Sequence, residues 1–530
     1  MLSELLDLHQ VNTDARLVIY PKNKPKVLQA LKQGRVEYVD LTSWKFMDYF
    51  FGYLFEHRFF ETIGEAFPDL RKKEEIPAWF LIAAYTQLKC HTEEATHNLP
   101  FVLRSGTILN RVSANLRVES GGFNNRNKHP RKAPIDQDTA RKFFKRAPPQ
   151  SIMDWFNRDA VGFFLEHRAF DAEGIGILDS TFLPVTDNPN YKEAAPMPLD
   201  KNGHLVDLDK MSEQERKKFK WTPCFRLTNL LHTTRATDYF LYLGAHLGPG
   251  DESELKAGEK LVEDFMSRCG NHRLKLLIVD RGFIDGPMIT RFKKERRLDV
   301  LIPLKKSMDA YKDVLGLARL EDAVWVRHRH RETVDKDGVQ TVTTLDLAAF
   351  HDITSWQDCK VPLSAVLCRE TVEREGKKEE NVWVLVTTRK FETPGEIYEF
   401  YEKRTQIEER HKQLKLFWNL GVFTSPEFSL VTAHVFFILL AYSALQWYLR
   451  QDVMERMACK TIKTLQYEER LLKKDNVIVY ADGCFGAFRF KTFMSIVFNL
   501  EGDARKQMKE SLDKMPKDLE DLEEEHNRSP

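Results

Sequence analysis

The hydrophobic pattern changes character near residue 174. Residues 1–75 carry apolar side chains at helical spacing, as at Val27, Leu28 and Leu31. The segment 76–91 is apolar almost throughout and predicts a buried helix, with Pro77 suited to its first turn. Thr92 followed by two acids predicts the start of a second helix. The first part of the chain is therefore expected to be helical.

From residue 174 onward, short apolar runs alternate with amphipathic segments. The predicted order is β-β-β-α-β-α-β, with strands at 174–185, 224–234, 239–248, 274–283 and 299–306 and helices at 253–269 and 286–297. Three strands followed by alternating helices predict an α/β fold with a mixed sheet covered by helices. The same order occurs in the ribonuclease-H fold, so we expect a ribonuclease-H-like core.

The remaining chain departs from this alternation. Residues 310–392 hold four strand-like pieces separated by turn signals, which predicts a β-rich insertion. A long helix is expected near 396–417, followed by further helix and a tail rich in acids. The predicted organisation is 1–150, helical; 174–309, first part of the core; 310–392, insertion; 393–450, second part of the core; and 451–530, a helical region with an acidic tail.

Residues 430–449 form a stretch of twenty without Asp, Glu, Lys or Arg, long enough to cross a membrane. Thr432, His434, Ser443 and Gln446 interrupt it, and no second such stretch exists. A buried helix in a large core is the favoured interpretation, and no membrane partner is expected.

Composition narrows the class of protein. The chain has 530 residues, 42% of them hydrophobic, with 80 Lys and Arg against 79 Asp and Glu. This balance excludes a disordered chain and a uniformly basic coat protein. The seven cysteines are odd in number and form no Cys-x2-Cys pair, so a disulfide framework and a Cys-rich zinc site are not expected.

The near-zero net charge hides a basic segment. Residues 101–146 hold eleven Lys and Arg against three acids, and their Gly and Asn indicate an exposed loop. Such a segment beside helices is typical of contact with a phosphate backbone, and we take Arg131, Lys132, Arg141 and Lys142 as its DNA-binding patch. A helix-turn-helix within 76–116 would fit, although spacing alone favours an ordinary helical hairpin.

Three carboxylates are candidates for a catalytic site. Asp179 lies in the first core strand, and Asp280 ends the fourth. Burying a carboxylate there is costly unless it is paired or binds metal. On the helix at 396–417, the residues Tyr401, Arg404, Glu408, Lys412 and Lys415 share one face. Periodicity alone would make this a surface helix stabilised by ion pairs.

The spacing Tyr401-x2-Arg404-x3-Glu408-x6-Lys415 resembles the signature of bacterial insertion-sequence-four transposases, which have a DDE active site. Asp179-Ser-Thr and Asp280-Arg-Gly-Phe283 resemble the family's two aspartate motifs. The resemblance covers roughly 174–450. It implies that Asp179, Asp280 and Glu408 are catalytic and hold two Mg²⁺ ions, with Mn²⁺ as a substitute. Tyr401, Arg404, Lys412 and Lys415 would act on DNA phosphate.

The resemblance also implies partners and a reaction path. The expected protein cuts a mobile element at its inverted-repeat ends and joins those ends to target DNA, as a homodimer in the synaptic complex. It would work in the bacterial cytoplasm, at the nucleoid. A DNA hairpin would need a surface for an extruded base, for which Trp325 is the candidate among Trp325, Trp356 and Trp383.

Two other functions fit the same residues. One is a transposase-derived DNA-binding protein that has lost catalysis, although three retained acids speak against it. The other is a metal-dependent nuclease of the same fold that lacks strand transfer.

Overall fold

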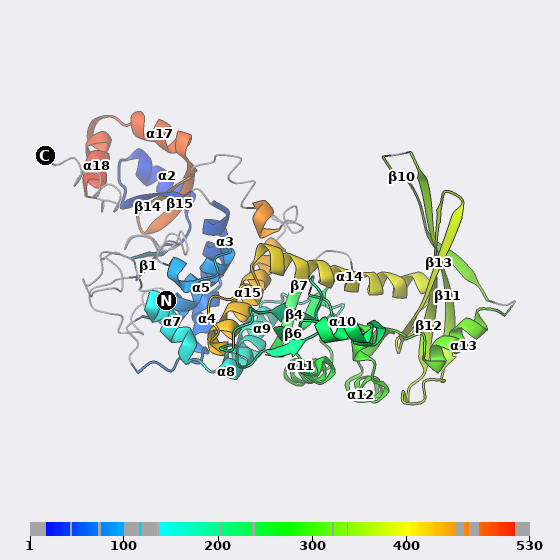
Figure 1. Ribbon diagram of the computed structural model, residues 1–530. Helices are drawn as coiled ribbons and strands as arrows, with labels where there is room; N and C mark the ends of the chain where they lie inside the picture. Colours follow the sequence, from blue (N-terminus) through cyan, green and yellow to red (C-terminus); the bar gives the residue numbers. More distant parts are fainter. Residues whose placement is uncertain are drawn as a thin grey trace. The chain divides into compact units, whose positions relative to one another are not determined.

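The chain forms two compact units, Phe164–Lys412 and Met1–Phe163 with Gln413–Pro530 (Figure 1). The computed structural model describes residues 17–42, 45–72, 76–99, 116–118, 135, 137–201, 203–235, 239–320, 323–336, 338–450, 461–465 and 476–514. Each unit is described separately below.

A mixed sheet forms the centre of the unit Phe164–Lys412. Its core strands are β4 (Ile175–Pro184), β6 (Thr222–Thr233), β7 (Phe240–Pro249), β8 (Leu276–Val279) and β9 (Asp299–Pro303). They lie in the order β7-β6-β4-β8-β9. β6 runs antiparallel to β4 and β7, whereas β8 runs parallel to β4 and β9. The five predicted strands are present in the predicted order along the chain, and the mixed sheet is consistent with a ribonuclease-H-like core.

Helices α11 (Glu254–Cys269) and α12 (Gly286–Arg296) follow β7 and β8, as the sequence predicts (Figure 1). Both begin at side chains that cap free backbone N–H groups, since Ser253 accepts from Lys256 and Asp285 accepts from Met288. The apolar face of α11 buries Leu261, Val262 and Phe265. Between β4 and β6 lie the short β5 (Ala195–Met197) and α10 (Glu213–Lys218).

The β-rich segment extends this sheet. Strands β10 (Trp325–Val334), β11 (Gln340–Ile353), β12 (Leu363–Arg374) and β13 (Lys377–Thr387) pair antiparallel in sequence order, and β13 pairs with β9. The sequence analysis missed α13 (Asp309–Leu317), which precedes them and buries Ala310, Tyr311 and Val314. The long helix α14 (Pro394–Phe417) follows β13, and its bounds agree with the predicted helix at 396–417 to within two residues.

Helices dominate the other unit. Its described helices are α2 (Lys24–Lys32), α3 (Lys45–Glu56), α4 (Phe59–Glu65), α5 (Ala78–Cys90), α7 (Gln137–Arg146), α8 (Pro149–Trp155), α15 (Phe428–Leu449), α17 (Phe490–Phe498) and α18 (Gly502–Asp513). On α15, the Phe437 ring stacks with Trp155 at 5.5 Å and meets Tyr85 edge-on at 5.0 Å. Among the described residues, α15 alone is long and apolar enough to cross a membrane, and 89% of its most apolar stretch is buried. The burial favours the core-helix interpretation.

The region 451–530 differs from the predicted helical pattern. Strands β14 (Asn476–Ala481) and β15 (Cys484–Arg489) form a hairpin, and β14 also pairs with β2 (Tyr38–Thr42). Asp482 and Gly483 join the two strands with φ of 51° and 67°, the conformation that a two-residue hairpin requires. The apolar, β-branched run at 477–479 and this Asp-Gly pair are the signals in the sequence that indicate a hairpin rather than a helix.

The segment after α5 also differs. No helix begins at Thr92, whose φ is 63°, and the next helical residues are the short turn Thr96–Asn98. Local side-chain hydrogen bonds hold this backbone instead: the buried Lys89 ammonium donates to the carbonyl oxygens of Glu93 and Glu94. The predicted helix-turn-helix extends into residues 100–115, which lie outside the described residues.

Candidate active site

Asp179 and Asp280 stand side by side because of the sheet register. In the parallel pairing of β4 with β8, Leu178 lies opposite Val279. The next residue on each segment is an aspartate. Asp179 is 8% exposed, and the side chain of Asp280 is 40% exposed. The parallel register of β4 and β8 thus brings two carboxylates together at the end of β8.

The segment after β8 is shaped by close packing. The Asp280 carboxylate accepts from the Arg281 backbone N–H, and Phe283 is buried. A Cβ at position 282 would meet the Glu254 carboxylate, so a larger residue here would displace the Glu254 side chain. Glu254 also accepts from the Ser180 hydroxyl, directly after Asp179. Glu254 therefore contacts both aspartate-bearing segments.

Helix α14 supplies the third carboxylate. Phe400, Ile407 and Leu414 are buried at seven-residue steps, as the sequence predicts. This packing leaves Arg404 and Glu408 on a neighbouring face. The Glu408 side chain is 62% exposed, whereas that of Arg404 is 11% exposed.

Arg404 lies between all three carboxylates. Its Nη2 is 2.7 Å from Asp280 Oδ2 and 4.0 Å from Asp179 Oδ1, and its Nη1 is 3.1 Å from Glu408 Oε1. One guanidinium thus faces Asp179, Asp280 and Glu408, which establishes that the three acids converge. The sequence analysis placed Arg404 on the face of Glu408 but did not foresee this central position.

Asp179 is held in an unfavourable environment for a charge. The pKa of Asp179 is raised to about 7. Burial is the main cause, the charges of Asp280 and Glu408 act in the same direction, and Arg404 acts against them. A cation placed beside Asp179 would therefore stabilise its ionised form.

The donor set fits divalent metal ions. Carboxylate oxygens are the ligands that Mg²⁺ prefers, and the three acids here surround a cationic group. Among the described residues, no group of three or more His, Cys, Asp or Glu is arranged as a preformed metal site. Arg404 supplies the positive charge between the acids instead.

The other predicted residues of α14 differ in exposure. Tyr401 is half-buried, and burial raises its pKa, while Arg404 lowers it. Lys412 is exposed, and burial lowers the pKa of the half-buried Lys415. Helical spacing places Lys412 one turn and Lys415 two turns beyond Glu408.

Two polar residues near Asp179 were not predicted from the sequence. Asn229 lies directly opposite Asp179 in the β4–β6 ladder, and His411 follows Glu408 by three positions on α14. Both side chains are buried, and His411 Nδ1 is 3.9 Å from Asp179 Oδ2. The i, i+3 spacing from Glu408 was the available signal for His411.

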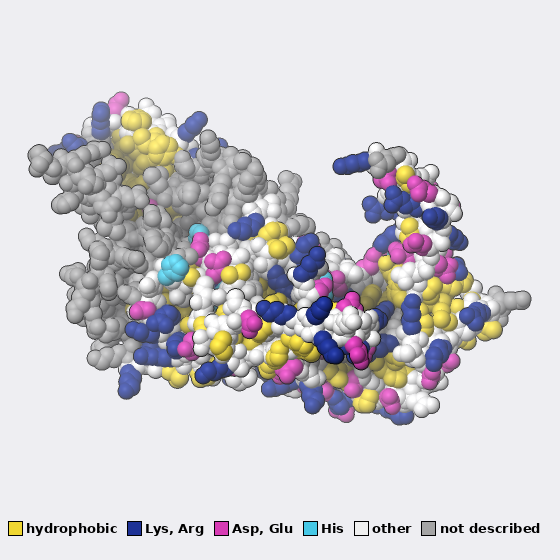
Figure 2. All heavy atoms as spheres, viewed as in Figure 1, with side chains coloured by type: hydrophobic (Ala, Val, Ile, Leu, Met, Phe, Trp, Pro, Cys, Tyr) yellow, Lys and Arg dark blue, Asp and Glu magenta, His cyan; other side chains and the backbone are white. Residues whose placement is uncertain are grey.

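The predicted base-stacking residue lies at the start of β10. Trp325 is half-buried, and the Arg369 guanidinium lies 3.9 Å from its ring centre. Trp356 is buried and Trp383 is half-buried. Figure 2 shows Lys and Arg side chains on the projecting β10–β13 strands, interspersed with acids.

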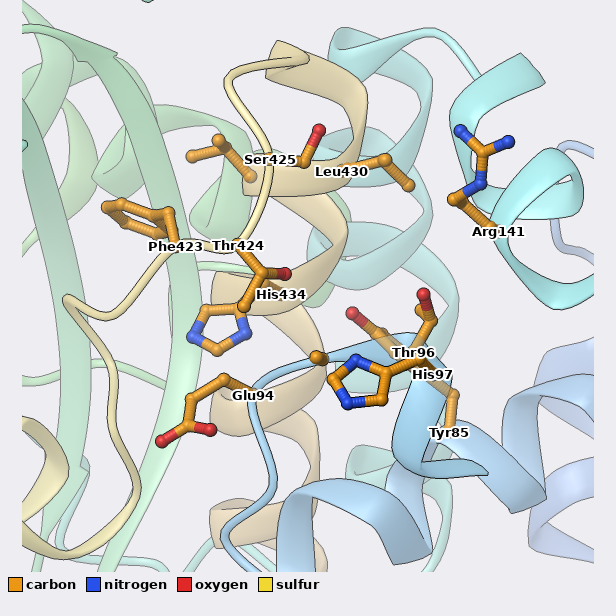
Figure 3. Close-up of a pocket in the computed structure, with 12 residues that line it drawn as sticks. Tyr85, Glu94, Thr96, His97, Arg141, Phe423, Thr424, Ser425, Leu430 and His434 are labelled. Atoms are coloured by element: carbon orange, nitrogen blue, oxygen red, sulfur yellow. The ribbon is translucent and has the colours of Figure 1, made fainter. Parts of the chain in front are cut away.

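The predicted DNA-binding patch is only partly described. Arg131 and Lys132 lie outside the described residues, whereas Arg141 and Lys142 are exposed on α7. Arg141 pairs with Asp138 at 3.2 Å. It also lines a cavity of about 160 Å³ together with His97, Phe423 and His434 (Figure 3). None of the three carboxylates lines this cavity, so it is separate from the candidate active site.

Comparison with known protein families follows from this geometry. The family model described as "Transposase DDE domain" matches residues 171–444, which contain Asp179, Asp280 and Glu408. No curated protein matches the chain.

Proposed function

The chain belongs to the transposase DDE domain family, and from this premise we propose that it is a cut-and-paste transposase of the insertion-sequence-four type. The convergence of Asp179, Asp280 and Glu408 around Arg404 carries the proposal. The match establishes a DDE transposase, whereas the type and the reaction path are our inference. The protein would act on DNA in the bacterial cytoplasm, as a homodimer that holds two element ends.

The proposed reaction breaks and forms phosphodiester bonds. In the first step, water attacks phosphorus at the element end, and the bond to the 3′-oxygen breaks to leave a free 3′-hydroxyl. That hydroxyl then attacks a second phosphodiester, so a new P–O bond forms and another 3′-oxygen leaves. One site serves each step because only the attacking oxygen differs.

The roles of the residues follow from their chemistry. Asp179, Asp280 and Glu408 would hold two Mg²⁺ ions, which activate the attacking oxygen and neutralise charge on the leaving oxygen when bound. Arg404, Lys412 and Lys415 would interact with phosphate oxygens, and Tyr401 would donate a hydrogen bond. Fixed positive groups act most strongly where charge develops in the transition state.

The direct test is cleavage of DNA that carries the element's ends. With Mg²⁺ or Mn²⁺, the protein should nick and then release such ends, and it should join pre-cut ends to target DNA. The Asp179→Ala variant should do neither. Cleavage that persists in this variant would refute the assignment, and cleavage without joining would indicate a nuclease.

The segment 101–146 should provide sequence-independent DNA affinity. Replacing Arg131, Lys132, Arg141 and Lys142 together should weaken binding and reduce the log–log salt slope by roughly 3.6, because each lost phosphate contact removes about 0.9. Binding isotherms at several salt concentrations measure this slope. An unchanged slope would move the DNA contact elsewhere, most simply to 76–100.

Trp325 should act at the hairpin step. Extruding a terminal base costs a few kcal/mol, and an aromatic ring with cationic neighbours can receive it. We expect Trp325→Ala to leave first-strand nicking intact and to reduce hairpin formation about tenfold or more, since stacking on an aromatic ring is worth about 1–3 kcal/mol. A strand-resolved cleavage assay measures both steps. Normal hairpin formation in the variant would exclude this role.

A further inference from the structure

The side chain of His411 lies beside Asn229 on β6 and Asp179 on β4. It is 6% exposed and projects from α14 toward the β4–β6 ladder. Its Nε2 is 3.2 Å from Asn229 Nδ2, and its Nδ1 is 3.9 Å from Asp179 Oδ2. Asn229 is fully buried and lies opposite Asp179 in the ladder. A polar chain therefore runs from Asn229 through His411 to Asp179.

The contact between Asn229 and His411 is compatible with one arrangement of the imidazole hydrogen. An amide nitrogen can only donate, so a hydrogen bond between Asn229 Nδ2 and His411 Nε2 requires the tautomer in which Nε2 accepts. In a neutral imidazole the other nitrogen then carries the hydrogen. The Nδ1–H group thus faces Asp179 Oδ2.

Asp179 lies between two donors, one for each oxygen. Arg404 is 4.0 Å from Oδ1, and His411 is 3.9 Å from Oδ2. Both separations exceed the length of a hydrogen bond, so the two groups act on Asp179 through charge and dipole rather than through a direct bond in this conformation. A donor on Oδ2 leaves Oδ1 directed toward the region that Asp280 and Glu408 share.

We propose that His411, oriented by Asn229, is a positioning residue that holds Asp179 for metal binding. The inference rests on the proposed function, because it assumes that Asp179 is a metal ligand. It adds a role for two residues outside the three carboxylates. Because His411 and Glu408 share α14, the same contact also fixes the helix that carries the third ligand against the strand that carries the first.

The test measures Mn²⁺ binding to the full chain at pH 8 without DNA, by the electron paramagnetic resonance signal of free Mn²⁺. The specific sites are those lost in Asp179→Ala. His411→Ala should weaken them about 10–100-fold, the usual effect of losing a partner behind a ligand. His246→Ala is the matched control, since His246 is on β7 and pairs with Glu252 at 2.9 Å. It should bind Mn²⁺ like the unchanged protein.

Two conservative variants separate positioning from packing. His411→Asn places an amide nitrogen where the ring has Nδ1, whereas His411→Gln places one near Nε2. We expect the Asn variant to retain affinity within about threefold of the parent and the Gln variant to bind as weakly as His411→Ala. Equal affinity of the Asn and Gln variants, or normal affinity of His411→Ala, would overturn the proposal. Neither result would affect the proposed function, which fails only if Asp179→Ala still cleaves DNA.

Discussion

Glu408→Gln should abolish metal-dependent DNA cleavage while leaving the fold and DNA binding intact. Glutamine keeps the shape of the side chain but removes the charge that a divalent cation requires. Losing a partner behind a ligand costs about 10–100-fold, so losing the ligand's charge should cost more than about 100-fold. Cleavage rates and DNA affinity, measured on one preparation, test both parts.

The surroundings of Glu408 make this variant informative. Its side chain is 62% exposed and pairs with Arg404 at 3.1 Å. Glu408 itself is exposed, and Arg404 keeps Asp280 as a partner at 2.7 Å, so the variant should unfold within about 1 kcal/mol of the parent. A large loss of soluble, folded protein would instead assign Glu408 a structural role on α14. Glu409→Gln, one residue away and also exposed, is the matched control for expression and stability.

The core of the fold could be predicted because its strands are continuous apolar runs. Apolar runs of this kind mark buried strands, and their order leaves few ways to arrange a mixed sheet. The neighbouring positions of Asp179 and Asp280 follow from that order, since β4 and β8 run parallel. The C-terminal hairpin was missed although Asp482 and Gly483 mark its turn, because its partner β2 lies more than 400 residues earlier.

The details of the site depend on contacts that sequence order does not determine. Asn229 faces Asp179 only because of the antiparallel register between β4 and β6. His411 approaches Asp179 only because α14 packs with that side inward. Arg404 contacts three acids through a long side chain. The conformation of that side chain depends on the packing around it, which the sequence does not specify. Helical periodicity identifies the face but not the partner.

Asp179→Asn should inactivate the enzyme and stabilise the metal-free protein. The pKa of Asp179 is raised from 3.8 to about 7 by burial, so at pH 8 folding retains a charge that the environment disfavours. A pKa raised from 3.8 to about 7 corresponds to about 4 kcal/mol of free energy of unfolding. Asparagine removes this penalty and preserves the size of the side chain.

The pH dependence gives the sign of the effect. Below pH 4 the carboxyl is protonated in the folded and unfolded states, so parent and variant should have similar free energies of unfolding. Between pH 4 and 7 the unfolded chain releases the proton first, and the parent loses stability relative to the variant. Above pH 7 the difference should stay constant at its full value. Urea unfolding at pH 4, 6 and 8 measures this profile.

Divalent metal should reduce the stability advantage of the Asp179→Asn variant. Because an ion that binds only the folded state stabilises it by RT ln(1 + [L]/Kd), Mg²⁺ or Mn²⁺ at pH 8 should raise the unfolding midpoint of the parent and leave that of Asp179→Asn nearly unchanged. An equal rise in the two proteins would mean that the metal binds elsewhere. A variant less stable than the parent at pH 8 without metal would mean that the Asp179 charge is compensated by Arg404 and supports the fold. We expect Asp179→Asn to be more stable than the parent without metal and to gain no stability when metal is added. Both results together are expected only if the Asp179 carboxylate destabilises the metal-free fold and binds a cation.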